Sequence, residues 1–300
     1  MIKKLLLLLG LGLFLTGCAD TNISVDDGVP RNEQGESIVG DSGLNVNSKD
    51  YYLSVALGEI DNVSSIHKFG SGTIGTNYQI ISSSGVYMVP TSPVSLEFVS
   101  SDPEDTYLGI GAREITIEVI NSLWEREVIT INTSGTTAVP LPIDVLRVTK
   151  WYVSSSGSYA NPPTSVSYQG DLEIRELGNG PTWTQILNSP TTTGQSQIGA
   201  YTIPKGKTAY LLSKSIFSDT TKNADIYFFF RDNSDDVTAP YDGARRIIER
   251  EVGLSGGYNV DFTVPKGPYV GPAEIGFFGA VSQGNSDVSV EFELLLIDTE

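Results

Sequence analysis

The sequence predicts an all-β protein with two antiparallel β-sandwich domains, jelly-roll-like in topology, that follow a signal peptide and a disordered tether. From residue 51 onward, short runs of Val, Ile, Tyr, Phe and Thr are separated by Gly, Pro, Asn, Asp and Ser, a composition typical of strands and turns. Helical periodicity is nearly absent, and no strand-helix rhythm indicates a parallel sheet. The expected parts are a signal peptide at 1–17, a tether at 18–48, and sandwich domains at 49–195 and 196–300.

The first 17 residues have the organisation of a signal peptide. Lys3 and Lys4 supply a positive charge, and an apolar run follows from residue 5 to residue 15. This run is shorter than the roughly 20 residues that cross a bilayer as a helix, but it fits the apolar core of a leader that is removed.

The leader ends in Leu15, Thr16, Gly17 and Cys18, and Cys18 is the chain's single cysteine. This tetrapeptide resembles the bacterial lipobox. The resemblance implies that Cys18 is lipidated and becomes the first mature residue, so that the membrane is a partner through a lipid anchor. No acidic residue directly follows the cysteine, which implies an outer-membrane or cell-surface lipoprotein. An ordinary secretory leader with an accidental cysteine is the alternative.

The charge of the chain is strongly negative. The formal net charge is −17, and removal of Lys3 and Lys4 with the leader leaves 17 basic against 36 acidic residues, or −19. This charge argues against a nucleic-acid partner, because nucleic-acid binding relies on basic side chains. With one cysteine the chain forms no internal disulfide, so buried area must stabilise the fold.

Residues 18–48 are rich in Asp, Glu, Asn, Ser and Gly and contain no aromatic residue. Such a segment buries too little apolar surface to fold, which favours a flexible tether. A terminal arm that adds a strand to the folded body is the alternative.

Two segments show the strand pattern clearly. Ile115, Ile117 and Val119 alternate with polar residues, and the apolar residues of the last strand alternate with acidic residues and a serine over 287–294. One face of each strand is therefore expected in a core. Further strands are expected at 51–57, 94–99, 145–153, 207–217, 225–231 and 273–281.

Residues that could support catalysis are sparse. His67 is the single histidine, and it is expected on the surface or in a loop. The glycine-rich stretch 70–80 precedes no helix that could bind a phosphate, so a hairpin loop is expected there. No catalytic residues are assigned.

Carboxylates provide two weaker hypotheses. Glu125 and Glu127 flank Arg126 next to Trp124, and a pair of carboxylates suffices for glycoside hydrolysis; exposed strand charges are the alternative. Asp232, Asp235 and Asp236 could bind calcium, although the segment lacks the glycine and the final glutamate of a calcium loop. A solvated acidic loop is the alternative, and no other cofactor is expected.

Residues 109–139 combine Gly-Ile-Gly-Ala-Arg, an alternating strand, a Trp-centred turn, a second strand and a Gly-Thr-Thr hairpin. Together with residues 197–212, this segment resembles a recurrent part of uncharacterised, phage-encoded marine proteins. The resemblance implies a β-rich, non-enzymatic structural protein, such as a head decoration or a tail-associated component. The lipoprotein leader departs from that pattern.

These observations predict a non-enzymatic structural or binding protein, phage-associated, displayed on a virion or lipid-anchored at the cell envelope. It would contact protein or glycan, and it could form a homo-oligomer. The alternative is a carbohydrate-active enzyme that uses paired carboxylates.

Overall fold

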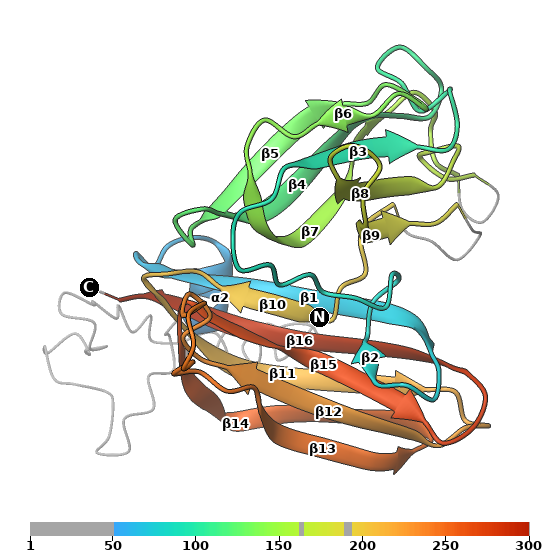
Figure 1. Cartoon of the computed structure of the whole chain (residues 1–300). Coiled ribbons are helices and arrows are strands. Elements are labelled where there is room, and N and C mark those ends of the chain that lie inside the picture. Colours follow the sequence, from blue (N-terminus) through green and yellow to red (C-terminus); the bar gives the residue numbers. More distant parts are fainter. Residues whose placement is uncertain (1–50, 162–164, 189–193, 300) are drawn as a thin grey trace, which may run out of the picture. The chain divides into compact units, whose positions relative to one another are not determined.

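The computed structural model describes residues 51–161, 165–188 and 194–299 (Figure 1). The leader, the lipobox residues Leu15, Thr16, Gly17 and Cys18, and the tether at 18–48 lie outside the described residues. Residues 60–300 belong to one compact unit, and the short described segment at 51–59 lies outside it. No helix in the described part of the chain is long and apolar enough to cross a membrane.

The larger unit contains four antiparallel sheets, which confirms the all-β prediction. Sheet I has the order β1 (Val63–Ile74), β16 (Ser286–Asp298), β11 (Lys207–Ser218) and β14 (Gly256–Val270). Sheet II has the order β10 (Ala200–Ile203), β15 (Ala273–Val281), β12 (Ala224–Arg231) and β13 (Arg246–Leu254), and β2 (Gln79–Ile80) also pairs with β15. Sheet III has the order β6 (Val139–Pro140), β3 (Leu96–Ser100), β8 (Leu172–Glu176) and β9 (Thr182–Ile186), and sheet IV has β5 (Arg126–Asn132), β4 (Ala112–Asn121) and β7 (Val145–Ser156).

The largest core collects side chains from sheets I and II. Val288, Val290, Phe292 and Leu294 of β16 are all buried, as their alternation predicts. The ring of Phe292 lies 5.8 Å from that of Phe277 on β15, so aromatic pairs join the two sheets.

A second core collects side chains from sheets III and IV. Ile115, Ile117 and Val119 of β4 are fully buried in it, as predicted. The Trp151 ring from β7 lies edge-on to Phe98 of β3, and its Nε1 donates a hydrogen bond to Thr184 Oγ1 at 3.1 Å. Because Trp151 is fully buried, this bond satisfies a polar atom that would otherwise be costly to bury.

Strand β1 pairs with β16 along its full length, and Figure 1 shows the two strands side by side in blue and red. A strand from the predicted N-terminal segment thus completes a sheet formed by the predicted C-terminal segment. The hairpin expected at 70–80 is wrong, because residues 70–74 belong to β1 while β2 lies in sheet II. Glycine is required instead by close packing: a Cβ on Gly70 would lie 2.1 Å from the Gly199 nitrogen.

The strand expected at 51–57 is also wrong, since Tyr51–Ala56 forms the short helix α2. Leu57 N donates to Leu53 O at 3.0 Å, and Gly58 follows with a φ of 70°. A glycine in the left-handed region is a common helix terminus, and this signal outweighs the local alternation of apolar residues.

The Gly-Ile-Gly-Ala-Arg motif at 109–113 surrounds a buried carboxylate. Asp105 is fully buried and accepts hydrogen bonds from Ser100 Oγ and from the backbone nitrogens of Ala112, Gln169 and Gly170 at 2.6 to 2.8 Å. A Cβ on Gly111 would lie 2.1 Å from Asp105 Oδ1, so this glycine makes room for the carboxylate. The motif has a structural role in joining the loop at 101–111 to β4.

Candidate binding site

The site is built around Glu274, which sits near the start of β15. Register places it opposite Arg231 of β12 on one side and opposite Thr202 of β10 on the other. Arg231 Nη1 lies 3.8 Å from Glu274 Oε2. Opposite charges on directly paired residues of neighbouring strands stabilise a sheet, so these residues hold the end of β12 against β15.

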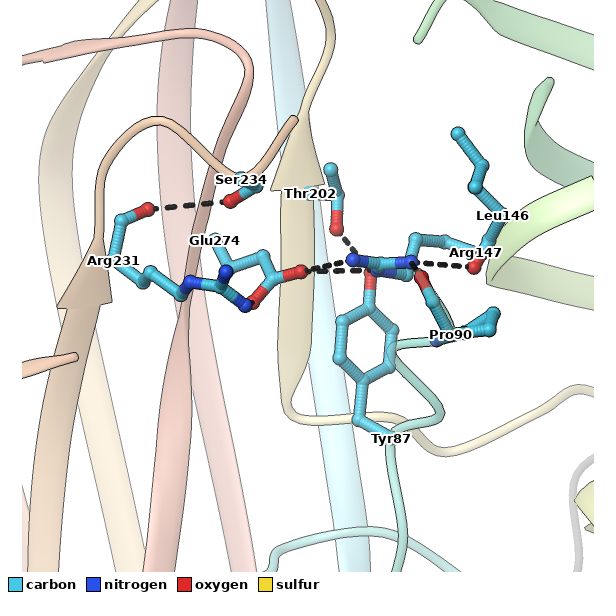
Figure 2. Close-up of polar contacts among 8 residues, drawn as sticks. All are labelled: Tyr87, Pro90, Leu146, Arg147, Thr202, Arg231, Ser234 and Glu274. Carbon is cyan, nitrogen blue, oxygen red and sulfur yellow. Dashed lines mark hydrogen bonds and ion pairs between the residues drawn. The ribbon is translucent and has the colours of Figure 1, made fainter. Parts of the chain in front are cut away.

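Arg147 reaches Glu274 from β7 and is almost fully buried (Figure 2). Its Nε and Nη2 donate to Glu274 Oε1 at 3.0 and 2.6 Å, and its Nη1 donates to the carbonyl oxygens of Pro90 and Leu146 at 3.2 and 2.7 Å. A guanidinium carries five N–H donors, and four hydrogen bonds use most of them. The pair therefore ties sheet IV to sheet II through a satisfied buried charge.

The Trp124 ring packs against the Arg147 guanidinium. Its ring centroid lies 5.1 Å from the Arg147 Cζ, within range of a cation–π interaction. Trp124 has a φ of 65°, and its carbonyl oxygen accepts a hydrogen bond from Lys205 N at 2.8 Å. A bulky residue in the left-handed region is strained, and these two contacts explain why the turn keeps that conformation.

A pocket of about 470 Å³ lies beside Glu274, a volume within the range of small-molecule sites. Apolar and aromatic side chains dominate its lining, with two arginines and Glu274 as the charged groups. The lining residues include Tyr87, Phe229, Arg231, Tyr241, Arg245 and Glu274.

Tyr87 closes one wall of the pocket. Its hydroxyl lies 2.7 Å from Thr202 Oγ1, and Figure 2 shows its ring beneath the Arg147 guanidinium. Burial raises the pKa of the Tyr87 hydroxyl above its ordinary value, so the group stays neutral. Tyr241 on the opposite loop is 59% exposed and so is open to a ligand.

An aromatic strip leads away from the pocket across sheet II. The Arg245 guanidinium lies 5.0 Å from the Phe278 ring, which stacks on Tyr227 at 5.3 Å. Tyr78 packs edge-on against Tyr227 and is 56% exposed. Pocket and strip together present flat rings beside guanidinium donors.

The loop at 232–245 forms the rim and contains the predicted calcium ligands. Asp232 accepts a hydrogen bond from Arg246 Nη2 at 2.7 Å, and Asp236 accepts one from the Asp242 backbone nitrogen. No group of three acidic, histidine or cysteine residues in the described part of the chain is arranged to hold a metal ion, so Asp232, Asp235 and Asp236 are not brought together as a calcium site. Asp232 and Asp236 instead accept hydrogen bonds that stabilise the loop at the rim of the pocket.

The other predicted residues lie apart from this pocket. Glu125 precedes β5 and is exposed, whereas Glu127 lies within β5 and accepts a hydrogen bond from Asn121 Nδ2 at 3.2 Å. His67 is exposed on β1 beside Glu291, as a surface histidine should be. Cys18 and the lipobox residues lie outside the described residues.

The sequence analysis missed Arg147 and Glu274. Glu274 is the single charge in AEIGFFGAV, and Arg147 is one of two charges, with Lys150, in the otherwise largely apolar VLRVTKWYV. A charge in a buried strand needs a partner, so these two positions carried a usable signal. Their sequence separation of 127 residues concealed that they pair with each other.

Comparison with known proteins gives no family. No family model and no curated protein matches the chain. A structure of the infectious bursal disease virus Gx strain aligns at 11% identity and a TM-score of 0.24, covering 83% of this chain and 77% of that chain. The VP2 subviral particle of the same virus aligns at 10% identity and a TM-score of 0.18, covering 79% and 76%.

An Arthrobacter globiformis T6 isomalto-dextranase complexed with panose aligns at 12% identity and a TM-score of 0.19, covering 69% of this chain and 34% of that chain. These TM-scores are too low to establish a common fold. The site is therefore interpreted from the residues and distances of this chain.

Proposed function

We propose that this chain is a non-enzymatic binding protein that holds a saccharide in the pocket between β12, β15 and the loop at 232–245. The observation that carries the proposal is the lining of that pocket, where aromatic rings stand beside the Arg231 and Arg245 guanidiniums in about 470 Å³. Ligand sites are commonly apolar cavities with a few convergent polar groups, and this lining has that character.

A saccharide fits this lining because a sugar ring has flat apolar C–H faces and a rim of hydroxyl oxygens. The exposed rings of Tyr241 and Tyr78 offer surfaces on which such faces can stack. Arg245 offers planar hydrogen-bond donors for the hydroxyl oxygens, and it is already held over Phe278. The aromatic strip would accommodate further sugar units beyond the pocket.

Binding is better supported than cleavage. Glycoside hydrolysis ordinarily uses two carboxylates placed about 5 to 10 Å apart around the scissile bond. Among the described residues that line the pocket, Glu274 is the one carboxylate, and it already accepts two hydrogen bonds from Arg147. The enzymatic alternative would have to use Glu125 and Glu127, neither of which lines this pocket.

The proposed setting is phage-associated: the protein is displayed on a virion or is anchored at the cell envelope through lipidated Cys18. The two cores, each shared by two sheets, support two sandwich domains as the displayed body. The net charge of −17 supports a soluble body that avoids anionic surfaces.

The binding proposal is tested by calorimetric titration of the full-length chain with a panel of neutral and acidic oligosaccharides. We expect at least one saccharide to bind, and Tyr241→Ala and Arg245→Gln to weaken it at least tenfold. Tyr107→Ala and Arg250→Gln are matched controls, because both residues are exposed and neither lines the pocket. Absence of binding across the panel, or equal binding by the pocket variants, contradicts the proposal, and release of reducing ends would favour the enzyme.

The anchor is tested with Cys18→Ser in an expressing bacterium. Wild-type protein should partition with the membrane fraction and carry acyl chains detectable by mass spectrometry, because two or three chains anchor a protein stably. The variant should appear in the soluble fraction. Membrane retention of Cys18→Ser would argue against a lipid anchor, and the presence of the protein in purified phage particles would favour the virion.

A further inference from the structure

A second, smaller cavity of about 200 Å³ lies where β1 and β10 meet sheet IV. Its walls come from five strands, β1, β4, β5, β7 and β10. The lining residues include Lys68 on β1, Glu118 on β4, Arg126 on β5, Thr149 and Lys150 on β7, and Tyr201 on β10. It shares none of these residues with the saccharide pocket.

Two polar groups in this cavity lack the partners that buried groups normally have. The Tyr201 hydroxyl is a buried side-chain atom with no hydrogen-bond partner among the described residues. Lys68 is 4% exposed, and its ammonium donates one hydrogen bond, to the Thr149 carbonyl oxygen, out of a possible three. Since buried polar groups are nearly always paired, unused donors that line a cavity indicate a missing partner.

The cavity is basic although the chain as a whole is acidic. Lys68, Arg126 and Lys150 face one carboxylate, Glu118, which already pairs with Arg126 at 3.0 Å. His67 lies at the same cavity and pairs with Glu291 of β16. The unused hydrogens of Lys68 and Tyr201 are donors, so the missing partner must be an acceptor.

From this geometry we propose that the cavity binds a small oxyanion, a carboxylate or a sulfate group, between the Lys68 ammonium, the Arg126 guanidinium and the Tyr201 hydroxyl. Its volume is below the roughly 300 Å³ at which drug-sized sites begin, so a single anionic group is the suitable occupant. Charge-assisted hydrogen bonds to the anion would satisfy both under-paired side chains.

The group could be free or part of a larger molecule. An adjoining cavity of about 520 Å³ shares Ser65, Ile66 and Arg126 with the small one, and its other charged lining residues are Lys205, Lys207 and one carboxylate, Glu125. An acidic sugar could therefore place its carboxylate or sulfate in the small cavity and its ring in the larger one.

Binding should depend on pH. Burial lowers the pKa of Lys68 to about 7, with Lys150 acting in the same direction and Glu118 opposing both. A bound anion favours the protonated ammonium, so affinity should fall as the pH rises through 7. Arg126 and Tyr201 keep their charge states across this range, and His67→Gln separates any contribution of the histidine.

The experiment is calorimetric titration of the full-length chain with sodium sulfate, sodium acetate, glucuronate and, as a neutral control, glucose, at pH 6.0 and pH 8.5. We expect an oxyanion probe to bind at pH 6.0 and to bind several-fold more weakly at pH 8.5. Binding of sulfate or acetate would identify a site for a free oxyanion. Binding of glucuronate alone would identify an anionic group carried on a sugar.

Two variants decide whether the cavity is responsible. Lys68→Met and Tyr201→Phe should each weaken binding about tenfold or more. Tyr201→Phe removes a hydroxyl that has no partner in the described part of the chain, so this variant should fold normally. Lys222→Met and Tyr269→Phe are matched controls, since neither residue lines the cavity. No binding by any anion at pH 6.0, or equal binding by Lys68→Met and Tyr201→Phe, would overturn the proposal.

Discussion

Arg147 and Lys68 are two buried cations whose surroundings differ. Arg147 belongs to β7, whereas Lys68 belongs to β1 and contacts β7 at Thr149, two residues beyond Arg147. Arg147 donates four hydrogen bonds and lies against Trp124, so the protein satisfies most of its donors. Lys68 donates one hydrogen bond at Thr149, beside a tyrosine hydroxyl with no partner among the described residues.

The difference separates a structural ion pair from the cavity that we propose as an oxyanion site. A buried charge that the fold satisfies contributes to the docking of two sheets, and its loss should damage stability. A buried charge that the fold leaves under-satisfied reduces stability until something binds to it.

The largest effect is expected from Glu274→Gln. The change leaves the Arg147 guanidinium buried without its counter-charge, and breaking a buried pair in this way costs about 3–5 kcal/mol. Urea denaturation of the wild type and the variant measures the loss of unfolding free energy.

The double variant Arg147→Met, Glu274→Gln is the control for this prediction. It removes both charges, so most of the lost stability should return. If the double variant is as unstable as the sum of the single variants, the two residues are not coupled as the geometry requires.

The next effect is a dependence of stability on pH that Lys68→Met should abolish. The unfolded chain keeps this lysine protonated up to its ordinary pKa of 10.5, whereas folded Lys68 has a pKa of about 7 and loses its proton there. The unfolded state therefore binds more protons above pH 7, and the wild-type unfolding free energy should rise with pH in this window.

Between pH 7 and pH 9, the unfolding free energy of the wild type should gain about 2 kcal/mol relative to Lys68→Met. Denaturation curves for both proteins at the two pH values measure the gain. Parallel pH profiles for the two proteins would mean that Lys68 stays protonated in the folded state.

The smallest effect compares two tyrosine hydroxyls. Tyr87→Phe removes the hydroxyl that bonds to Thr202 Oγ1, and we expect a loss of about 1 kcal/mol in unfolding free energy. Tyr201→Phe removes a hydroxyl without a partner among the described residues, so stability should be unchanged or slightly higher. Equal losses in thermal stability for both variants would contradict the contrast.

Much of the secondary structure could be predicted from the sequence, because alternation of apolar residues reports which face of a strand is buried. The strands at 145–156, 207–218 and 273–281 lie close to where they were expected, and the strand expected at 225–231 is β12. The segment at 51–56 was predicted wrongly because a helix of fewer than two turns is too short to establish a 3.6-residue period.

The sites could be predicted less well. Acidic residues cluster in the sequence at Glu125 and Glu127 and again at Asp232, Asp235 and Asp236. Only the second cluster lies near the pocket beside Glu274, in the loop that forms its rim. Arg147 and Glu274, the ion pair beside that pocket, lie 127 residues apart in the sequence and meet only through long-range packing.

Antiparallel β-structure and an acidic composition could be predicted from the amino-acid sequence alone, because side-chain period and charge are local properties. The tertiary structure decided which strands are neighbours, as when β1 pairs with β16 more than 200 residues away, and which charges are satisfied. The physical reason is that a hydrogen bond or an ion pair depends on distance in space, and in a fold rich in non-local strand pairs that distance is unrelated to separation along the chain.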